Sequence, residues 1–261
     1  MSPPLKAPPV YFTVAQVRFN AVLTLADFVP TMQEAMRRDG FSDFGQQQTV
    51  VLQLSGSDTP PAPQRQDRFT FGTLERKHLF LLDRGALTLQ STDYGTFQRF
   101  SEMFLRGLAI VDKAVGLDFT ERAGLRYLDR VVPREGESLA DYLVPGVLGA
   151  KGLLADMGAQ TLHTYAETVS KVGDVQLRAR VVTQAGPLAF PPDLAAEGMA
   201  IDPRLAQGTD WHAIIDSDGT VDGRAVFSIE DVAARLDKVH QVIGRAFRET
   251  ATDFAFKAWN E

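Results

Sequence analysis

The chain has 261 residues, of which 44% are apolar and 23% charged, and it carries a net charge of −6 at pH 7. This acidic balance, without a run of Lys and Arg, argues against nucleic acid and against an anionic membrane surface as partners. The absence of cysteine excludes disulfides, thiolate metal sites and cysteine nucleophiles. The N-terminus has no signal-like apolar segment, and no apolar run approaches the roughly 20 residues that cross a bilayer. We therefore expect a cytoplasmic protein.

Hydrophobic periodicity predicts seven elements in the first half of the chain. In chain order they are a strand (10–19), a helix (25–38), two strands (about 50–54 and 69–73), a hairpin (78–83 and 86–91) and an amphipathic helix (96–115). Sequential strands joined by short turns favour an antiparallel sheet with helices on one face, and the class is α+β.

The second half repeats this order. The predicted elements are a strand (122–132), a helix starting near 139, two strands (161–170 and 175–183), a hairpin (211–227) and a long helix (229–250). A connection without periodicity, residues 184–210, is long enough to be a lid, a binding loop or a disordered insert. The aromatic residues of the tail, 253–259, are expected to fold back on the core because they would otherwise form an exposed apolar patch.

Two short sequence blocks occur twice. The pattern A-x-[VL]-R-[FY] stands at 15–19 and 123–127, and [ST]-L-A-D-[FY] stands at 24–28 and 138–142. An internal duplication would give two similar β-α-β-β-β-β-α lobes, residues 1–118 and 119–261, related by a pseudo-twofold axis. One merged domain is the alternative.

The aspartates of the second block point to helix starts. We favour Asp27 and Asp141 as N-caps, because this places Pro30 at the third helical position, where no intrahelical donor is lost. The other interpretation is a capping box that begins at Thr24 and Ser138.

Arg18 and Arg126 occupy equivalent positions of the first block. Strand alternation places each on the face opposite its apolar neighbours, so the pair could hold a carboxylate or phosphate bidentately. The commoner alternative is a structural ion pair with a strand carboxylate such as Glu121, Asp129 or Glu167.

The segment Asp216-Ser217-Asp218-Gly219-Thr220-Val221-Asp222-Gly223 is similar to a calcium loop. The carboxylates of Asp216, Asp218 and Asp222 would be the ligands, but Ile229 stands where the final bidentate Glu is required. A hairpin turn between two strands explains the same residues, and we predict no metal site.

No recognised catalytic or nucleotide-binding motif is present, and no cofactor is predicted. His163, Tyr165 and Glu167 share one face of a predicted strand, so they are the candidate acid–base or ligand-binding residues of that strand. A strand histidine hydrogen-bonded to a neighbour is the commoner alternative.

Three further segments carry a resemblance to other proteins. They are Pro4-Leu5-Lys6-Ala7-Pro8-Pro9-Val10 leading to Arg18-Phe19, the block from Leu87 through Tyr94 to Arg122–Arg130, and the ending with Phe247 and Trp259. On these residues the chain resembles a sporadically distributed bacterial family of uncharacterised proteins of similar length. It differs from the family pattern at Phe97, where the family often has Trp, and at Asp129, where Asn is common. The resemblance implies an accessory interaction or regulatory role and carries over no catalytic residue.

Three functions therefore stay open. The first is a non-enzymatic binding module for a protein partner or a small acidic ligand. The second is an enzyme with a lid-covered site near His163 and Glu167. The third is a homo-oligomeric structural element, with a homodimer as its simplest form.

Overall fold

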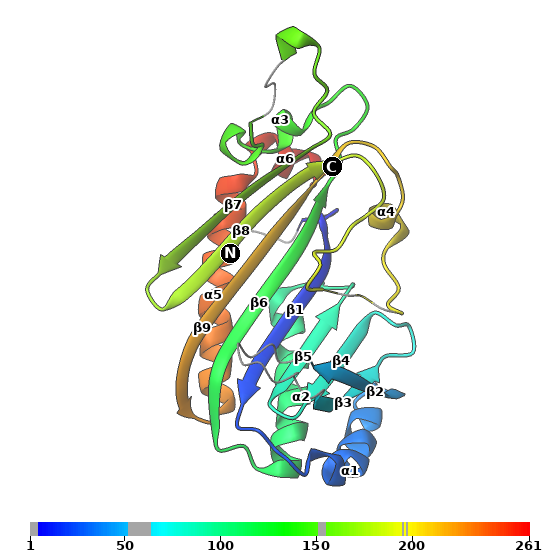
Figure 1. Cartoon of the computed structure of the whole chain (residues 1–261), viewed down its shortest axis with the longest axis vertical. Coiled ribbons are helices and arrows are strands. Elements are labelled where there is room, and N and C mark those ends of the chain that lie inside the picture. The colour runs from blue at the N-terminus through cyan, green and yellow to red at the C-terminus, as the bar shows by residue number, and fades with distance from the viewer. Residues whose placement is uncertain (1–4, 52–63, 151–154, 195, 197) are drawn as a thin grey trace, which may run out of the picture.

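The computed structural model describes residues 5–51, 64–150, 155–194, 196 and 198–261. Its nine strands form one antiparallel sheet in the order β2-β3-β4-β5-β1-β6-β9-β8-β7 (Figure 1). The predicted α+β class is confirmed. The strands are β1 (Val10–Phe19), β2 (Asp43–Val51), β3 (Gln64–Gly72), β4 (His78–Asp83), β5 (Ala86–Ser91), β6 (Phe119–Val131), β7 (His163–Val172), β8 (Val175–Gln184) and β9 (His212–Val226). The helices are α1 (Leu25–Arg38), α2 (Phe97–Val115), α3 (Leu139–Tyr142), α4 (Pro203–Ala206), α5 (Ile229–Thr250) and α6 (Asp253–Ala258), with 3₁₀ turns at Pro145–Val147 and Ala155–Met157.

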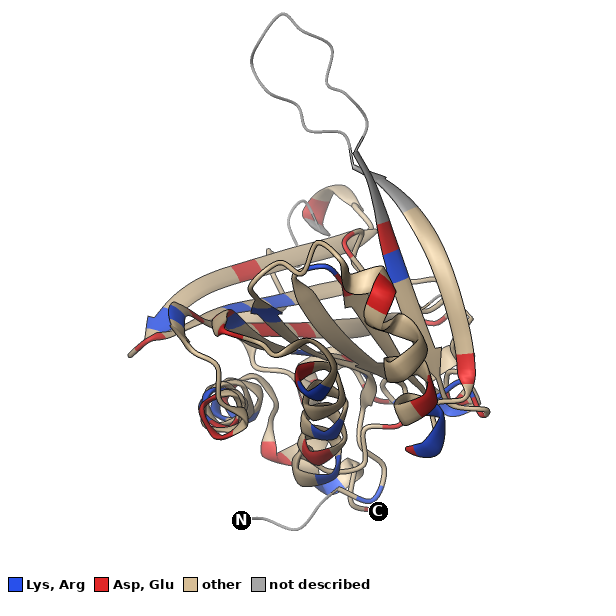
Figure 2. Ribbon diagram, turned by 90° about the horizontal axis from the view of Figure 1, so that it is seen from below, with Lys and Arg blue, Asp and Glu red and all other residues tan. Residues whose placement is uncertain are grey.

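The sheet is built outward from the central pair β1–β6. In that pair Ala15 lies opposite Leu125, and Val17 lies opposite Ala123. These residues belong to one buried apolar cluster with α1, α2 and α5, which cover this side of the sheet (Figure 2). We call it the helix face. The opposite side, on which the alternate residues of each strand lie, is the free face.

Two glycines allow close approach of the helices to the sheet. A Cβ at Gly107 of α2 would lie 2.3 Å from Cζ of Phe80, and one at Gly219 of β9 would lie 2.7 Å from Cγ1 of Val239 in α5. Both distances are shorter than the non-bonded contacts that real Cβ atoms make, so a larger residue at either position would force the neighbouring side chain or helix to shift.

The C-terminal tail folds back on its own chain, as predicted. Residues of α3 and α6 form a second apolar cluster at one end of the sheet. Trp259 is buried there, and its ring stacks on Phe247 with centroids 5.8 Å apart. Phe254 of the same tail is 43% exposed, so the tail joins the core only in part.

The prediction of a hairpin at 211–227 is wrong. Asp216 to Gly219 lie in the middle of the single 15-residue strand β9, which pairs with β6 and β8 along most of its length. The Asp and Gly residues that suggested a turn have other roles, because Asp216 binds arginines of the neighbouring strands and Gly219 admits α5. The second half is thus β-α-β-β-β-α, one strand shorter than expected.

The predicted N-caps are also wrong. Thr24 and Ser138 precede α1 and α3, and Ser138 forms a capping box with Asp141. Pro30 lies inside α1 and not in its first turn. Leu52 and Leu54 of the predicted second strand lie outside the described residues. In the described part of the chain, no helix combines the length and apolar character needed to cross a membrane.

Candidate functional site

Arg126 is the centre of an ion cluster on the free face. Its Nε and Nη2 donate to Oδ1 and Oδ2 of Asp216 at 2.7 and 2.8 Å. Its Nη1 and Nη2 donate to Oδ2 and Oδ1 of Asp193 at 2.6 and 3.2 Å. One guanidinium therefore holds two carboxylates, each by two hydrogen bonds, which is the strongest geometry for such a pair.

The cluster continues across three strands. Nη2 of Arg180 in β8 lies 2.7 Å from Oδ2 of Asp216, and its Nε lies 3.9 Å from Oε2 of Glu167 in β7. The hydroxyl of Tyr165 donates to the same Glu167 oxygen at 2.8 Å. We call Arg126, Asp193, Asp216, Arg180 and Glu167 the ionic row.

The two carboxylates on Arg126 differ in exposure. The side chain of Asp216 is 3% exposed, whereas that of Asp193 is 61% exposed. Burial opposes the charge of Arg126, but the bonds to Asp216 and Asp193 outweigh it and raise the pKa of the guanidinium. The hydrogen bonds from Arg126 lower the pKa of Asp193.

Asp218 borders the row on the same strand as Asp216. It lies opposite Arg126 on one side and Arg178 on the other. Burial raises its pKa, and the nearby arginines act against that rise.

We call residues 184–210 the strap, and its described residues lie on the free face beside the upper part of β1 (Figure 1). The hydroxyl of Tyr11 donates to the carbonyl oxygen of Ala189 at 2.9 Å, and Thr92 donates to that of Ala200 at 2.6 Å. Arg130 donates to three strap carbonyls, those of Leu205, Gln207 and Gly208. Asp193 lies between the first two of these anchors.

Apolar packing also holds the strap in place. Its apolar residues pack on a buried cluster of the free face. The rings of Phe190 and Phe12 meet edge to face at 5.1 Å. The described part of the strap therefore packs against the free face of the sheet.

The structure does not bring the two predicted arginines together. Arg126 lies opposite Val14 on β1, and Arg18 is four residues further along that strand, opposite Arg122. Arg18 is exposed, whereas Arg126 is buried. The alternative of a structural ion pair gave the right kind of partner for Arg126 but the wrong carboxylates.

One of the three β7 candidates, Glu167, belongs to the ionic row, and a second, Tyr165, is bonded to it. Tyr165 and Glu167 bond to each other and reach Arg180. His163 begins β7 opposite Gln184 and is exposed. It makes no hydrogen bond or ion pair with any described residue, so the structure does not place it with Glu167 as an acid–base pair.

The three aspartates considered for calcium are spread along β9. Asp216 is bound by two arginines, and Asp222 lies 3.7 Å from Arg122. An extended strand cannot wrap its carboxylates around one ion. Over the described ranges, no group of three or more acidic or histidine side chains is arranged to hold a metal.

Sequence reasoning missed a buried polar line on the helix face. His78, Ser91, Thr13 and Tyr127 are successive cross-strand neighbours on β4, β5, β1 and β6. All four are buried, and neither Nδ1 of His78 nor Oγ1 of Thr13 has a hydrogen-bond partner among the described residues. The signal in the sequence was that these polar residues stand at strand positions where the alternation otherwise places apolar, inward-facing residues.

Tyr127 connects this line to the helices. Its hydroxyl lies 3.3 Å from that of Tyr94 and 3.1 Å from Nδ1 of His240 in α5. Phe97 of α2 stacks on the imidazole at 4.0 Å, and burial lowers the pKa of His240. Asp129 lies two residues beyond Tyr127, and burial, together with the charge of Asp216, raises its pKa to about 7.

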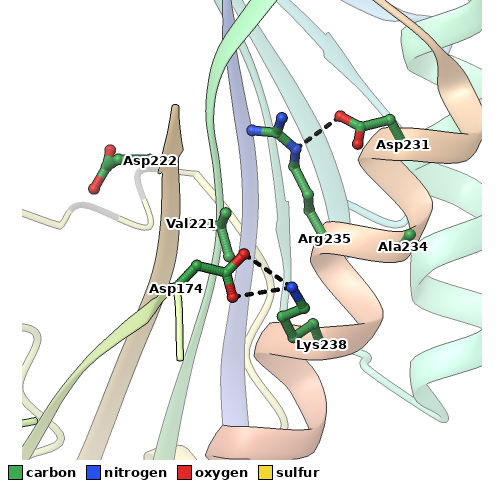
Figure 3. Close-up of a pocket in the computed structure, with 7 residues that line it drawn as sticks. All are labelled: Asp174, Val221, Asp222, Asp231, Ala234, Arg235 and Lys238. Atoms are coloured by element: carbon green, nitrogen blue, oxygen red, sulfur yellow. Dashed lines mark hydrogen bonds and ion pairs between the residues drawn. The ribbon is translucent and has the colours of Figure 1, made fainter. Parts of the chain in front are cut away.

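A shallow hollow of about 230 Å³ lies between α5 and the β8–β9 end of the sheet (Figure 3). Four of its five charged side chains form two pairs: Lys238 binds Asp174 at 2.8 Å, and Arg235 binds Asp231 of the same helix at 2.7 Å. Most of the charge in the hollow is therefore already paired, so we do not choose it as the candidate site.

No protein-family model matches the chain, and no curated protein matches it significantly.

Proposed function

We propose that the protein is a binding module that recognises a carboxylate through Arg126, in exchange for Asp193. The observation that carries this proposal is the double occupancy of Arg126 by one buried and one exposed carboxylate. Asp216 is the fixed partner. Asp193 is an internal carboxylate at the position that an acidic ligand would take.

The exchange keeps charge and hydrogen bonding balanced. An incoming carboxylate would accept the same two bonds from Nη1 and Nη2 of Arg126, and Asp193 would move into solvent. Asp193 is already mostly exposed, so its environment changes little when it moves into solvent. Displacing Asp216 would instead leave a buried charge without its partner. The ligand is a small carboxylic acid or an acidic side chain of a partner protein.

The ionic row supports binding better than catalysis. Its charged groups are engaged by one another, and the Tyr165 hydroxyl donates to Glu167. Such an arrangement orients and holds a charged group. A proton-transfer site would instead need an acid or base held free to face its substrate.

We also propose that the two halves arose by internal duplication and that only the second half carries the ionic row. The strand order is supporting, because β5 and β9 flank the central β1–β6 pair and lead into α2 and α5. The second residues of the two repeated blocks, Gln16 and Gly124, also lie opposite each other in the β1–β6 pair. In this proposal the first lobe kept Arg18, which has no acidic partner among the described residues. A superposition that fails to bring β1, β5 and α2 onto β6, β9 and α5 would contradict it.

The proposal is tested with Asp193→Asn, which removes the competing charge and keeps the side-chain shape. Isothermal titration calorimetry with citrate and with a hexaglutamate peptide separates a small acid from an acidic protein segment. We expect Asp193→Asn to tighten binding of the preferred probe by about tenfold. The matched control is Asp210→Asn, a strap carboxylate that does not bond to Arg126, and it should leave the affinity unchanged.

Two outcomes would contradict the proposal. One is an affinity that responds equally to Asp193→Asn and Asp210→Asn, which would indicate a general charge effect. The other is the absence of binding of both probes to Asp193→Asn at low salt, where such contacts are strongest.

A further inference from the structure

Strand β7 is an edge of the sheet whose second half is open on both faces. All residues from Glu167 to Val172 are exposed. The side chains of Val169 and Val172 lie on opposite faces of the strand, and each residue is 52% exposed. A strand with unpaired backbone groups and exposed valines is a template for another strand.

The hairpin with β8 fixes which backbone groups point outward. Val172 pairs with Val175 across the two-residue turn Gly173–Asp174, and Gly173 has φ 61°. In a two-residue hairpin the residues flanking the turn exchange both hydrogen bonds, and hydrogen-bonded positions then alternate along the strand. Glu167, Val169 and Lys171 therefore direct their N–H and C=O groups away from β8.

We propose that β7 pairs antiparallel with β7 of a second copy of this chain, with Val169 opposite Val169 of the partner subunit. This register joins the outward backbone groups of both strands. It also places Glu167 opposite Lys171 of the partner subunit, and the twofold axis repeats that pair. Oppositely charged residues that face each other across strands stabilise the pairing, whereas like charges oppose it.

Charge and symmetry favour a second copy over another occupant. The sequence around Val169 is self-complementary in charge, which a pairing of identical strands uses twice. Pairing of the same edge in both copies closes the assembly as a dimer. Pairing of β7 with the other edge, β2, would leave free edges at both ends and continue as a fibre.

The first test uses the absence of cysteine from the chain. Val169→Cys should form a disulfide between copies on mild oxidation, because paired strand positions lie within the Cα separation that a disulfide spans. Gln47→Cys on the edge strand β2 is the control for random collision and should stay uncrosslinked. Equal crosslinking of the two variants would overturn the proposed register.

The second test measures self-association by sedimentation equilibrium. Val169→Pro removes an outward N–H that β8 does not use, and it should weaken the dimer at least tenfold. Lys171→Glu should weaken it through repulsion by Glu167 of the partner subunit, whereas Val169→Thr keeps the N–H and should not. A wild-type chain that stays monomeric at about 100 µM, well above the µM dissociation constants of weak assemblies, would overturn the proposal. So would a dimer unchanged by Val169→Pro.

Discussion

The two faces of strand β6 bury charge in opposite ways. On the free face, Arg126 is buried with four hydrogen bonds to two carboxylates. On the helix face, Asp129 is also buried, but it makes no ion pair or side-chain hydrogen bond with any described residue, and its pKa is raised to about 7. The strand is the same, and the difference lies in the partners that neighbouring elements supply.

This difference follows from what a buried charge requires. Desolvation disfavours the ionised form of any buried group, and only nearby opposite charge and hydrogen bonds offset it. The free face receives these from β9, β8 and the strap. Asp129 is buried without such a partner among the described residues, and the charge of Asp216 adds to the desolvation, so its pKa is raised to about 7. The stability contributed by a paired buried charge therefore depends on its partner, whereas the stability contributed by a buried carboxyl without a partner depends on pH.

The largest expected effect is at Arg126. Arg126→Met would leave Asp216 buried with Arg180 as its remaining partner, and we expect a loss of about 3 to 5 kcal/mol in the free energy of unfolding. Urea denaturation measures it. The matched variant Arg126→Met/Asp216→Leu removes the stranded carboxylate and should recover part of the loss, because Arg180 then keeps only Glu167, 3.9 Å away. A double variant less stable than the single one would show that Asp216 is not the stranded charge.

The fold was predictable where the pattern was local. The strand at 10–19, the hairpin at 78–91 and the helices at 25–38 and 229–250 follow from apolar periodicity, and the structure confirms them. The region 211–227 was not predictable in this way. Its Asp and Gly residues carry local turn signals, and the groups that override them come from β6, β8 and α5, which are distant in sequence.

The candidate site shows the same limit. Strand alternation placed Arg126 opposite its apolar neighbours on one strand, and Tyr165 and Glu167 together on one face of another, because a period of two is a property of the strand itself. Which residues meet on that face depends on strand order and register. These placed β8 and β9 between β6 and β7 and so made Arg180 and Asp216 the link. Asp193 comes from a segment without periodicity, so no local signal identified it.

The second effect concerns Asp129 and pH. The folded-state pKa of about 7 lies above the ordinary value of 3.8, so the native state binds more protons than the unfolded state between these values. Stability should therefore fall as pH rises through this window, by up to about 1.4 kcal/mol per pH unit. Asp129→Asn removes the titrating group.

Urea denaturation at pH 5 and pH 8 distinguishes the two forms. We expect Asp129→Asn to be more stable than the wild type at pH 8, where the buried carboxyl must ionise, and to lose this advantage at pH 5. An equal stability difference at the two pH values would show that Asp129 does not titrate in this window, and the contrast between the two faces would then be one of packing alone.

The smallest effect is at Tyr127, which shows how far the helix face tolerates polar groups. Tyr127→Phe removes the hydroxyl that lies between Tyr94 and His240, so Nδ1 of the imidazole loses its partner. We expect a loss of about 1 kcal/mol, the typical net value of a neutral hydrogen bond with a buried partner left behind. Tyr94→Phe removes only the outer hydroxyl and should cost less. If Tyr94→Phe proves the more costly change, the hydroxyl of Tyr94 contributes more to stability than that of Tyr127. The hydroxyl of Tyr127 would then be a tolerated polar group in an otherwise apolar interface.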